Sequence, residues 1–199
     1  MVTDKIICVG KNYLDHAAEL GDAIPEDPVF FFKPPSSWVE SPGSVVELPK
    51  KHGSVHYECE IAYRIAVTNG RPSLKAVTLG LDLTLRDLQA TLKKKSLPWE
   101  AAKAFPRSAI TGKWIAVDEF KDHLKVPFEL LVNGELRQKS TGDQMRRTPT
   151  DLLGVTGEFF TICDGDVFFT GTPKGVGAIN PGDVLTLRWA DRLQYDVKF

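Results

Sequence analysis

Two glutamates that flank a single cysteine are the residues whose spacing most directly suggests chemistry. Glu58 and Glu60 lie in the segment 55–67, which we interpret as a β-strand. Side chains alternate between the two faces of a strand, so both carboxylates are expected on the same face. Two carboxylates at close range repel each other and shift their pKa values unless a cation lies between them. The pair indicates either a cation site or the solvent-facing polar edge of an ordinary strand.

An aspartate within an apolar run favours the cation site. Asp82 is surrounded by leucines and a glycine in residues 79–83, and a charge there is costly unless it is paired. Three carboxylates without a cysteine or imidazole partner suit a hard divalent ion such as Mg2+ or Mn2+ better than zinc. A metal-dependent enzyme with the candidate ligands Glu58, Glu60 and Asp82 is therefore the leading hypothesis.

A histidine and a glutamate near the N-terminus form a second candidate group. His16 and Glu19 are three residues apart in a predicted helix over 13–20, so they can touch. A carboxylate beside an imidazole orients it and raises its basicity, which suits a general base that activates water. The alternative is a surface pair on a short amphipathic helix.

Three further segments could contact an anionic substrate. Lys103, near a divalent ion, could neutralise the charge of a developing enolate, and Gln89 lies on the helix that follows Asp82. The loop 170–177 exposes backbone amides and hydroxyls that could hold a carboxylate, or it is a tight structural turn. The basic run 93–95 is interpreted as a helix C-terminus that complements the helix dipole, not as a site.

Length and composition exclude several classes of protein. The chain has 199 residues, a formal net charge of -1 and 42% hydrophobic residues, which fits one domain, residues 1–199, with a substantial core. The near-neutral charge argues against a nucleic-acid partner, and no apolar run approaches the roughly 20 residues that span a bilayer. Without a signal-peptide pattern at the N-terminus, we expect a cytoplasmic protein. Three cysteines in apolar runs, Cys8, Cys59 and Cys163, are expected to be buried and unpaired.

The pattern of elements predicts a β-rich α+β fold rather than a regular βαβ repeat. Asn12 is a candidate cap for the first helix, Thr84 with Asp87 a candidate capping box for the second, and Thr148 a cap for a third. Strands are expected at 5–9, 29–32, 55–67, 128–132, 135–138, 166–170, 184–189 and 195–199, with turns at 69–72 and 133–134.

Taken in order along the chain, these motifs resemble the fumarylacetoacetate hydrolase family, and most of all its short acylpyruvate hydrolases and oxaloacetate decarboxylases. The resemblance runs from about residue 6 to the C-terminus. It rests on the segments 10–13 with His16 and Glu19, 32–34, 58–60, 82–89, 99–105, 132–135 and 170–177.

The resemblance implies mixed β-sheets rolled into a sandwich, and a homodimer. It implies that Glu58, Glu60 and Asp82 bind the metal and that His16 and Glu19 form a catalytic dyad on a lid. Lys103 and Gln89 would contact the substrate, and Thr172 would hold its carboxylate. Lys11 stands where relatives often have arginine or serine, and a lysine cannot grip a carboxylate in a bidentate manner. Arg86 either faces the site or braces Asp82, and Tyr57 replaces a histidine that often precedes the first metal glutamate.

The resulting hypothesis is a Mg2+- or Mn2+-dependent hydrolase. It would cleave a C–C bond in acylpyruvate-type 2-oxo acids, such as fumarylpyruvate or acetylpyruvate, through a metal-stabilised pyruvate enolate, and it could also decarboxylate oxaloacetate. One alternative is an isomerase or decarboxylase of 2-hydroxy-dienoates in aromatic catabolism. Another is a ligand-binding relative that has lost the chemistry.

Overall fold

The computed structural model describes residues 3–19, 26–40, 43 and 45–199. The strands are β1 Ile6–Gly10, β2 Val29–Lys33, β3 Trp38–Glu40, β4 Val55–Tyr57, β5 Cys59–Thr68, β6 Arg71–Asp82, β7 Thr84–Leu85, β8 Ala109–Thr111, β9 Ile115–Ala116, β10 Phe128–Val132, β11 Glu135–Ser140, β12 Val167–Phe169, β13 Gly177–Ala178, β14 Val184–Trp189 and β15 Leu193–Lys198. The α-helices are α1 Leu14–Glu19, α2 Arg86–Lys94, α3 Glu100–Lys103 and α4 Pro149–Phe159, with short 3-10 turns at Pro35–Ser37, Val117–Glu119 and Gly142–Gln144.

The strands form three sheets of mixed direction. The largest has the order β2-β1-β12-β5-β6-β8-β3, with β9 beside β6. Its β1–β12 and β3–β8 pairs are parallel and its other pairs antiparallel. A four-stranded sheet, β11-β10-β14-β15, and a three-stranded sheet, β13-β4-β7, complete the fold. The predicted β-rich α+β class with mixed, curled sheets is confirmed.

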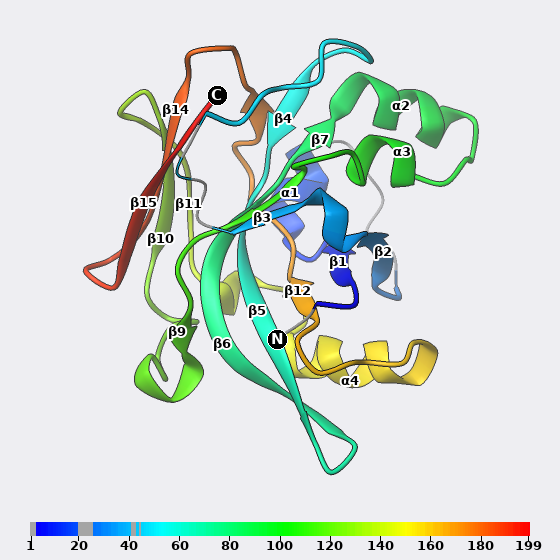
Figure 1. Ribbon diagram of the computed structural model, residues 1–199, viewed down its shortest axis with the longest axis vertical. Helices are drawn as coiled ribbons and strands as arrows, with labels where there is room; N and C mark the ends of the chain where they lie inside the picture. The colour runs from blue at the N-terminus through cyan, green and yellow to red at the C-terminus, as the bar shows by residue number, and fades with distance from the viewer. Residues whose placement is uncertain (1–2, 20–25, 41–42, 44) are drawn as a thin grey trace.

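The long strands β5 and β6 run through the middle of the molecule (Figure 1). The four-stranded sheet lies on one side of them, and α2 and α3 lie on the other. Buried apolar residues of both large sheets, such as Ile61, Leu79, Leu130 and Leu187, belong to one continuous core. None of the helices in the described part of the chain has the length and apolar character that a bilayer crossing requires.

The β5–β6 hairpin is closed by Asn69 and Gly70, within the turn predicted at 69–72, whereas the long strand β6 that follows was not predicted. Asn69 and Gly70 both have positive φ, 51° and 73°, which suits a type I′ turn and the right-handed twist of the strands. From this turn the register brings Cys59 opposite Leu81 and Glu60 opposite Gly80. The far ends of the two long strands therefore carry the predicted carboxylates into one place.

The strand predicted over 55–67 is interrupted at Glu58. β4 ends at Tyr57 and β5 begins at Cys59, and the two belong to different sheets. The carbonyl of Glu58 accepts a hydrogen bond from the Asp82 amide at 2.9 Å. The interruption lets the chain pass from one sheet to the other while this hydrogen bond ties Glu58 to the end of β6.

Two of the three predicted helix caps are wrong. Thr84 lies in β7 and donates to the Asp82 carbonyl, and the Asp87 carboxylate accepts from the amide of Ser54 instead of closing a capping box. The Asn12 side chain donates to the carbonyls of Thr170 and Arg147 rather than capping α1. In each case a partner distant in sequence has displaced the local hydrogen bond.

The third cap is as predicted. The Thr148 hydroxyl accepts from the Asp151 amide at 3.2 Å, and Pro149 is the first residue of α4. The helix continues through Gly154 and Gly157 to Phe159. Leu20, the last residue of the helix predicted over 13–20, lies outside the described residues.

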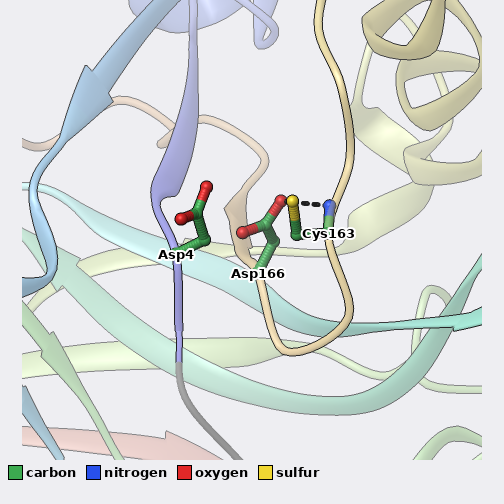
Figure 2. A group of neighbouring side chains, drawn as sticks. All are labelled: Asp4, Cys163 and Asp166. Carbon is green, nitrogen blue, oxygen red and sulfur yellow. Dashed lines mark hydrogen bonds between the residues drawn. The ribbon is translucent and has the colours of Figure 1, made fainter.

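Asp166, buried just before β12, fastens the residue before β1 to the loop that precedes β12; Figure 2 shows its hydrogen bond with the Cys163 amide, beside Asp4. The Asp166 carboxylate accepts from the amides of Lys5 and Cys163 and pairs with the Lys5 ammonium at 2.8 Å. The Lys5 ammonium also contacts the Cys163 sulfur and the Asp4 carboxylate. Cys8 and Cys59 are buried as predicted, whereas Cys163 is partly exposed beside this lysine.

Asp166→Asn should lower the free energy of unfolding by about 2–3 kcal/mol, because the buried Asp166 carboxylate serves two amides and one ammonium. Asp4→Asn is the matched control, since the Asp4 side chain is 66% exposed and pairs with the same lysine. Urea denaturation measures both variants. Equal losses of stability in the two would refute the assignment of this anchor to Asp166.

Candidate active site

The three predicted carboxylates lie together at the far ends of β5 and β6. Glu58, Glu60 and Asp82 each offer an oxygen within 4.8 Å of the others. Their exposed fractions are 4%, 2% and 1%. Such a concentration of buried negative charge is unfavourable unless cations or hydrogen-bond donors compensate it.

A lysine from α3 bridges two of these carboxylates. Lys103 Nζ donates to Glu58 Oε2 and Asp82 Oδ2, both at 2.6 Å, and its side chain is 3% exposed. Burial acts to lower the pKa of Lys103, but the neighbouring charges of Asp82 and Glu58 outweigh it and the pKa is raised. The side chain is therefore a fixed cation at neutral pH, suited to stabilise negative charge rather than to accept a proton.

Two more cations pair with Asp82 and Glu58. Lys33, at the end of β2, is fully buried, and its Nζ lies 2.8 Å from Asp82 Oδ1. It also donates to backbone carbonyls, including that of Lys103, so it positions α3 as well. Arg86, the first residue of α2, pairs through Nη2 with Glu58 Oε1, and its Nη1 donates to Gln89 Oε1 at 2.7 Å. The structure thus shows that Arg86 faces the site and braces Glu58.

Glu60 differs from the other two carboxylates. Among the described residues, Lys33, Arg86 and Lys103 form their ion pairs with Glu58 and Asp82 and not with Glu60. Glu60 Oε2 instead accepts a hydrogen bond from the Gly171 amide at 2.7 Å. Burial, followed by the charges of Asp82 and Glu58, raises the pKa of Glu60 well above its usual range. Additional positive charge placed between these three carboxylates would relieve the repulsion.

The donor set fits a divalent metal ion. All three groups are carboxylates, which Mg2+ and Mn2+ prefer, and they are already close without any rearrangement of the strands. Glu58, Glu60 and Asp82 would hold the ion. Asp4, Cys163 and Asp166 also lie close together, but Asp4 is exposed and the Lys5 ammonium contacts all three side chains. The buried trio is therefore the stronger candidate for a metal centre.

A small cavity of about 40 Å³ opens beside the carboxylates. It brings together most of the predicted site residues with aromatic side chains and residues from the start of the chain. The lining residues are Val9, Gly10, Lys11, Phe31, Glu58, Glu60, Asp82, Arg86, Gln89, Lys93, Trp99, Lys103 and Thr172. Lys11 has a φ of 61°, a strained backbone that is held by the adjacent Asn12 contacts with Thr170 and Arg147.

The Thr172 hydroxyl lines the cavity but is also part of the scaffold. It donates to the Cys59 carbonyl at 2.8 Å and accepts from Gln138 Nε2 at 2.9 Å. The other end of that amide, Gln138 Oε1, accepts from the Cys59 amide. Gln138, on β11, therefore fixes the loop 170–177 to the start of β5, and no local sequence pattern marked it as part of the site.

The predicted His16–Glu19 dyad is described only in part. Glu19 is exposed, and both its carboxylate oxygens accept from the Gly175 amide at 3.1 and 3.2 Å. The His16 backbone lies in α1, but its side chain is outside the described part of the structure. Among the described groups, α1 is thus joined to the loop 170–177, and the dyad itself stays a prediction.

Known proteins resemble this chain in sequence and in fold. The model of the family described as "Fumarylacetoacetate (FAA) hydrolase C-terminal" matches residues 5–194. The chain is 40% identical to oxaloacetate tautomerase YcgM of Escherichia coli (strain K12), over 92% of this chain and 87% of that protein. It is 36% identical to a mitochondrial oxaloacetate decarboxylase of Dictyostelium discoideum, over 91% and 86% of the two chains. A crystal structure of fumarylpyruvate hydrolase from Pseudomonas aeruginosa, in complex with Mn2+ and pyruvate, superimposes with a TM-score of 0.89 at 35% identity, covering 98% of this chain and 89% of that one.

Glu60→Gln should stabilise the metal-free protein but weaken its binding of a metal ion. The amide oxygen can keep the hydrogen bond from Gly171, while the repulsion with Glu58 and Asp82 disappears. In the presence of a chelator, we expect the variant to gain about 1 kcal/mol in the free energy of unfolding. Its affinity for Mn2+, measured by calorimetry, should fall by about 100-fold or more.

Glu135→Gln is the control for Glu60→Gln, because the Glu135 side chain is 72% exposed and does not line the cavity. This control should change neither quantity. A Glu60→Gln protein that binds Mn2+ as tightly as the wild type would contradict the assignment of Glu60 as a metal ligand.

Proposed function

The chain belongs to the fumarylacetoacetate hydrolase family, and on that premise we propose that it is a Mg2+- or Mn2+-dependent enzyme acting on small 2-oxo dicarboxylic acids such as oxaloacetate. The reaction that it promotes is formation of the enol or enolate, whether the outcome is keto–enol interconversion or loss of CO2. The observation that carries this proposal is the Lys103 ammonium, buried between Glu58 and Asp82 beside the cavity. The printed names of the Escherichia coli and Dictyostelium relatives support the same substrate.

The charges around the cavity favour a doubly charged substrate. The three carboxylates lie beside three cations, Lys33, Arg86 and Lys103, so the net charge of these groups is zero when all are ionised. A divalent ion would leave two positive charges without compensation, and Lys11 adds a further positive charge to the lining. A 2-oxo dicarboxylate brings two negative charges, whereas a simple 2-oxo acid brings one. The site thus complements oxaloacetate or fumarylpyruvate better than pyruvate or acetylpyruvate.

The residues of the chain have distinct tasks in enolate formation. A bound Mg2+ or Mn2+ would supply Lewis acidity toward the carboxylate and 2-oxo oxygens of the substrate. Lys103 supplies a fixed positive charge, and its third N–H, which Glu58 and Asp82 do not use, can donate to the 2-oxo oxygen as that oxygen gains negative charge. Arg86, held by Glu58 and Gln89, presents a second oriented cation to the substrate.

The walls of the cavity protect an enolate from water. Phe31 and Trp99 line one side and contact each other with ring centroids 6.2 Å apart. The small volume and the aromatic surface lower the local dielectric, which strengthens the contribution of Lys103. Neither reaction needs an attacking water. Decarboxylation releases CO2 and leaves the bonding electron pair in the enolate, and enolisation transfers the C3 proton to a base such as solvent water at the cavity mouth. Lys103 and Arg86 supply the electrostatic part of both reactions.

Hydrolysis of acylpyruvates is the second candidate function. It needs a base that activates water, and the sequence assigns this task to His16 and Glu19. The contact of Glu19 with Gly175 supports this candidate, since it attaches α1 to the loop that carries Thr172. The similarity to a fumarylpyruvate hydrolase supports it as well.

Turnover of oxaloacetate by the purified protein tests the main proposal. With Mg2+ or Mn2+, we expect loss of the enol absorbance or release of CO2 faster than without protein, and a chelator should abolish it. Glu58→Gln should lower kcat/KM by about 1,000-fold, because it removes a metal ligand and a partner of Lys103 and Arg86. Full activity in the chelator would contradict the metal-dependent mechanism, and Glu135→Gln serves as the control variant.

His16→Ala separates the two candidate functions. If His16 activates water, the variant should hydrolyse fumarylpyruvate about 100-fold more slowly than the wild type while its oxaloacetate activity changes by less than about threefold. Pyruvate release and oxaloacetate consumption are measured on the same preparation. Equal losses in the two assays would show that His16 does not act as a water-activating base.

A further inference from the structure

The basic run at the end of α2 does not behave as one surface cluster. Lys93, Lys94 and Lys95 are consecutive, and helix geometry points them in different directions. Lys93 is half-buried and lines the cavity beside the carboxylates, while Lys94 and Lys95 are exposed. The helix-dipole interpretation of the whole run is therefore incomplete, because one of its members reaches the site.

Lys93 extends a polar face of α2 that begins at the carboxylates. Arg86, Gln89 and Lys93 are spaced by three and four residues, so their side chains share one side of the helix. Arg86 contacts Glu58 at one end of this row and Gln89 in the middle. Lys93 is the outermost member of the row and lies farthest along the helix from the buried carboxylates.

A surface groove of about 280 Å³ adjoins the inner cavity. It is lined by Arg86, Gln89, Ala90, Lys93 and Lys94. Three of these residues, Arg86, Gln89 and Lys93, also line the cavity. Lys93 therefore borders both spaces, where the outer part of a bound ligand would emerge from the cavity.

We propose that Lys93 binds the second carboxylate of the substrate and makes the site selective for 2-oxo dicarboxylates. This assignment rests on the proposed function for the position of the first carboxylate, beside Glu58, Glu60 and Asp82. It adds a specificity-determining residue to that site. The aromatic rings of Phe31 and Trp99 line the cavity as well, so the carbon chain between the two carboxylates has an apolar surface to contact.

The half-buried position of Lys93 gives this contact its selectivity. An ammonium that is partly removed from water forms a stronger charge-assisted hydrogen bond than an exposed one. A monocarboxylic 2-oxo acid has no second carboxylate for Lys93 to bind. Loss of the Lys93 charge should therefore selectively weaken the binding of dicarboxylates, by about tenfold or more.

The test compares two stable ligands that share an oxalyl head. N-oxalylglycine carries a second carboxylate, and oxamate does not. Calorimetry with Mn2+ present measures the Kd of each for the wild type, Lys93→Gln and Lys93→Arg. We expect Lys93→Gln to raise the Kd of N-oxalylglycine by tenfold or more and that of oxamate by less than twofold. In Lys93→Arg, both Kd values should stay within about threefold of those of the wild type.

Lys95→Gln is the matched control, since it removes the same charge from the same helix end at an exposed position. It should change neither Kd. Equal weakening of both ligands by Lys93→Gln, unchanged binding of N-oxalylglycine, or a wild type that binds neither ligand would overturn the assignment of Lys93. If Lys93→Gln weakens only the binding of N-oxalylglycine but the wild type does not turn over oxaloacetate, the proposed function is overturned and the Lys93 assignment stands.

Discussion

The site depends on the compensation of three buried carboxylates by cations that come from separate parts of the chain. Glu58 and Asp82 are brought together by the end of the β5–β6 hairpin, Lys33 comes from β2, Arg86 from α2 and Lys103 from α3. Removing one partner would leave a buried charge uncompensated, which is strongly unfavourable. The cluster therefore links the central sheet to the two helices that cover the cavity. Glu60, whose pKa is raised, is the member that carries the remaining unfavourable charge.

The sequence was most informative where the signal is local. An Asn-Gly pair predicts a tight hairpin because both residues tolerate positive φ, and the turns at Asn69 and Asn133 form as expected. Asp82 stood out because a charge within leucines needs a partner. The pairing of Glu58 with Glu60 followed from strand alternation, although the chain changes sheets at Glu58.

The sequence was least informative where a partner lies far along the chain. Lys33 follows three phenylalanines and looks like the polar end of a strand, yet it is fully buried against Asp82, 49 residues away in the numbering. Gln138 in β11 holds the Cys59 amide and the Thr172 hydroxyl, contacts that no spacing rule reveals. Asp87 was assigned to a capping box, but the amide of Ser54 binds its carboxylate. The orientation of α2, which brings Lys93 but not Lys95 to the cavity, is likewise set by tertiary packing.

Anomalous diffraction from crystals soaked with Mn2+ and oxalate tests the central claim most directly. We expect one strong manganese peak between Glu58, Glu60 and Asp82, with oxalate bound on the side of Lys103. A manganese peak at Asp4 and Asp166 instead, or no peak at the buried carboxylates at saturating Mn2+, would contradict it.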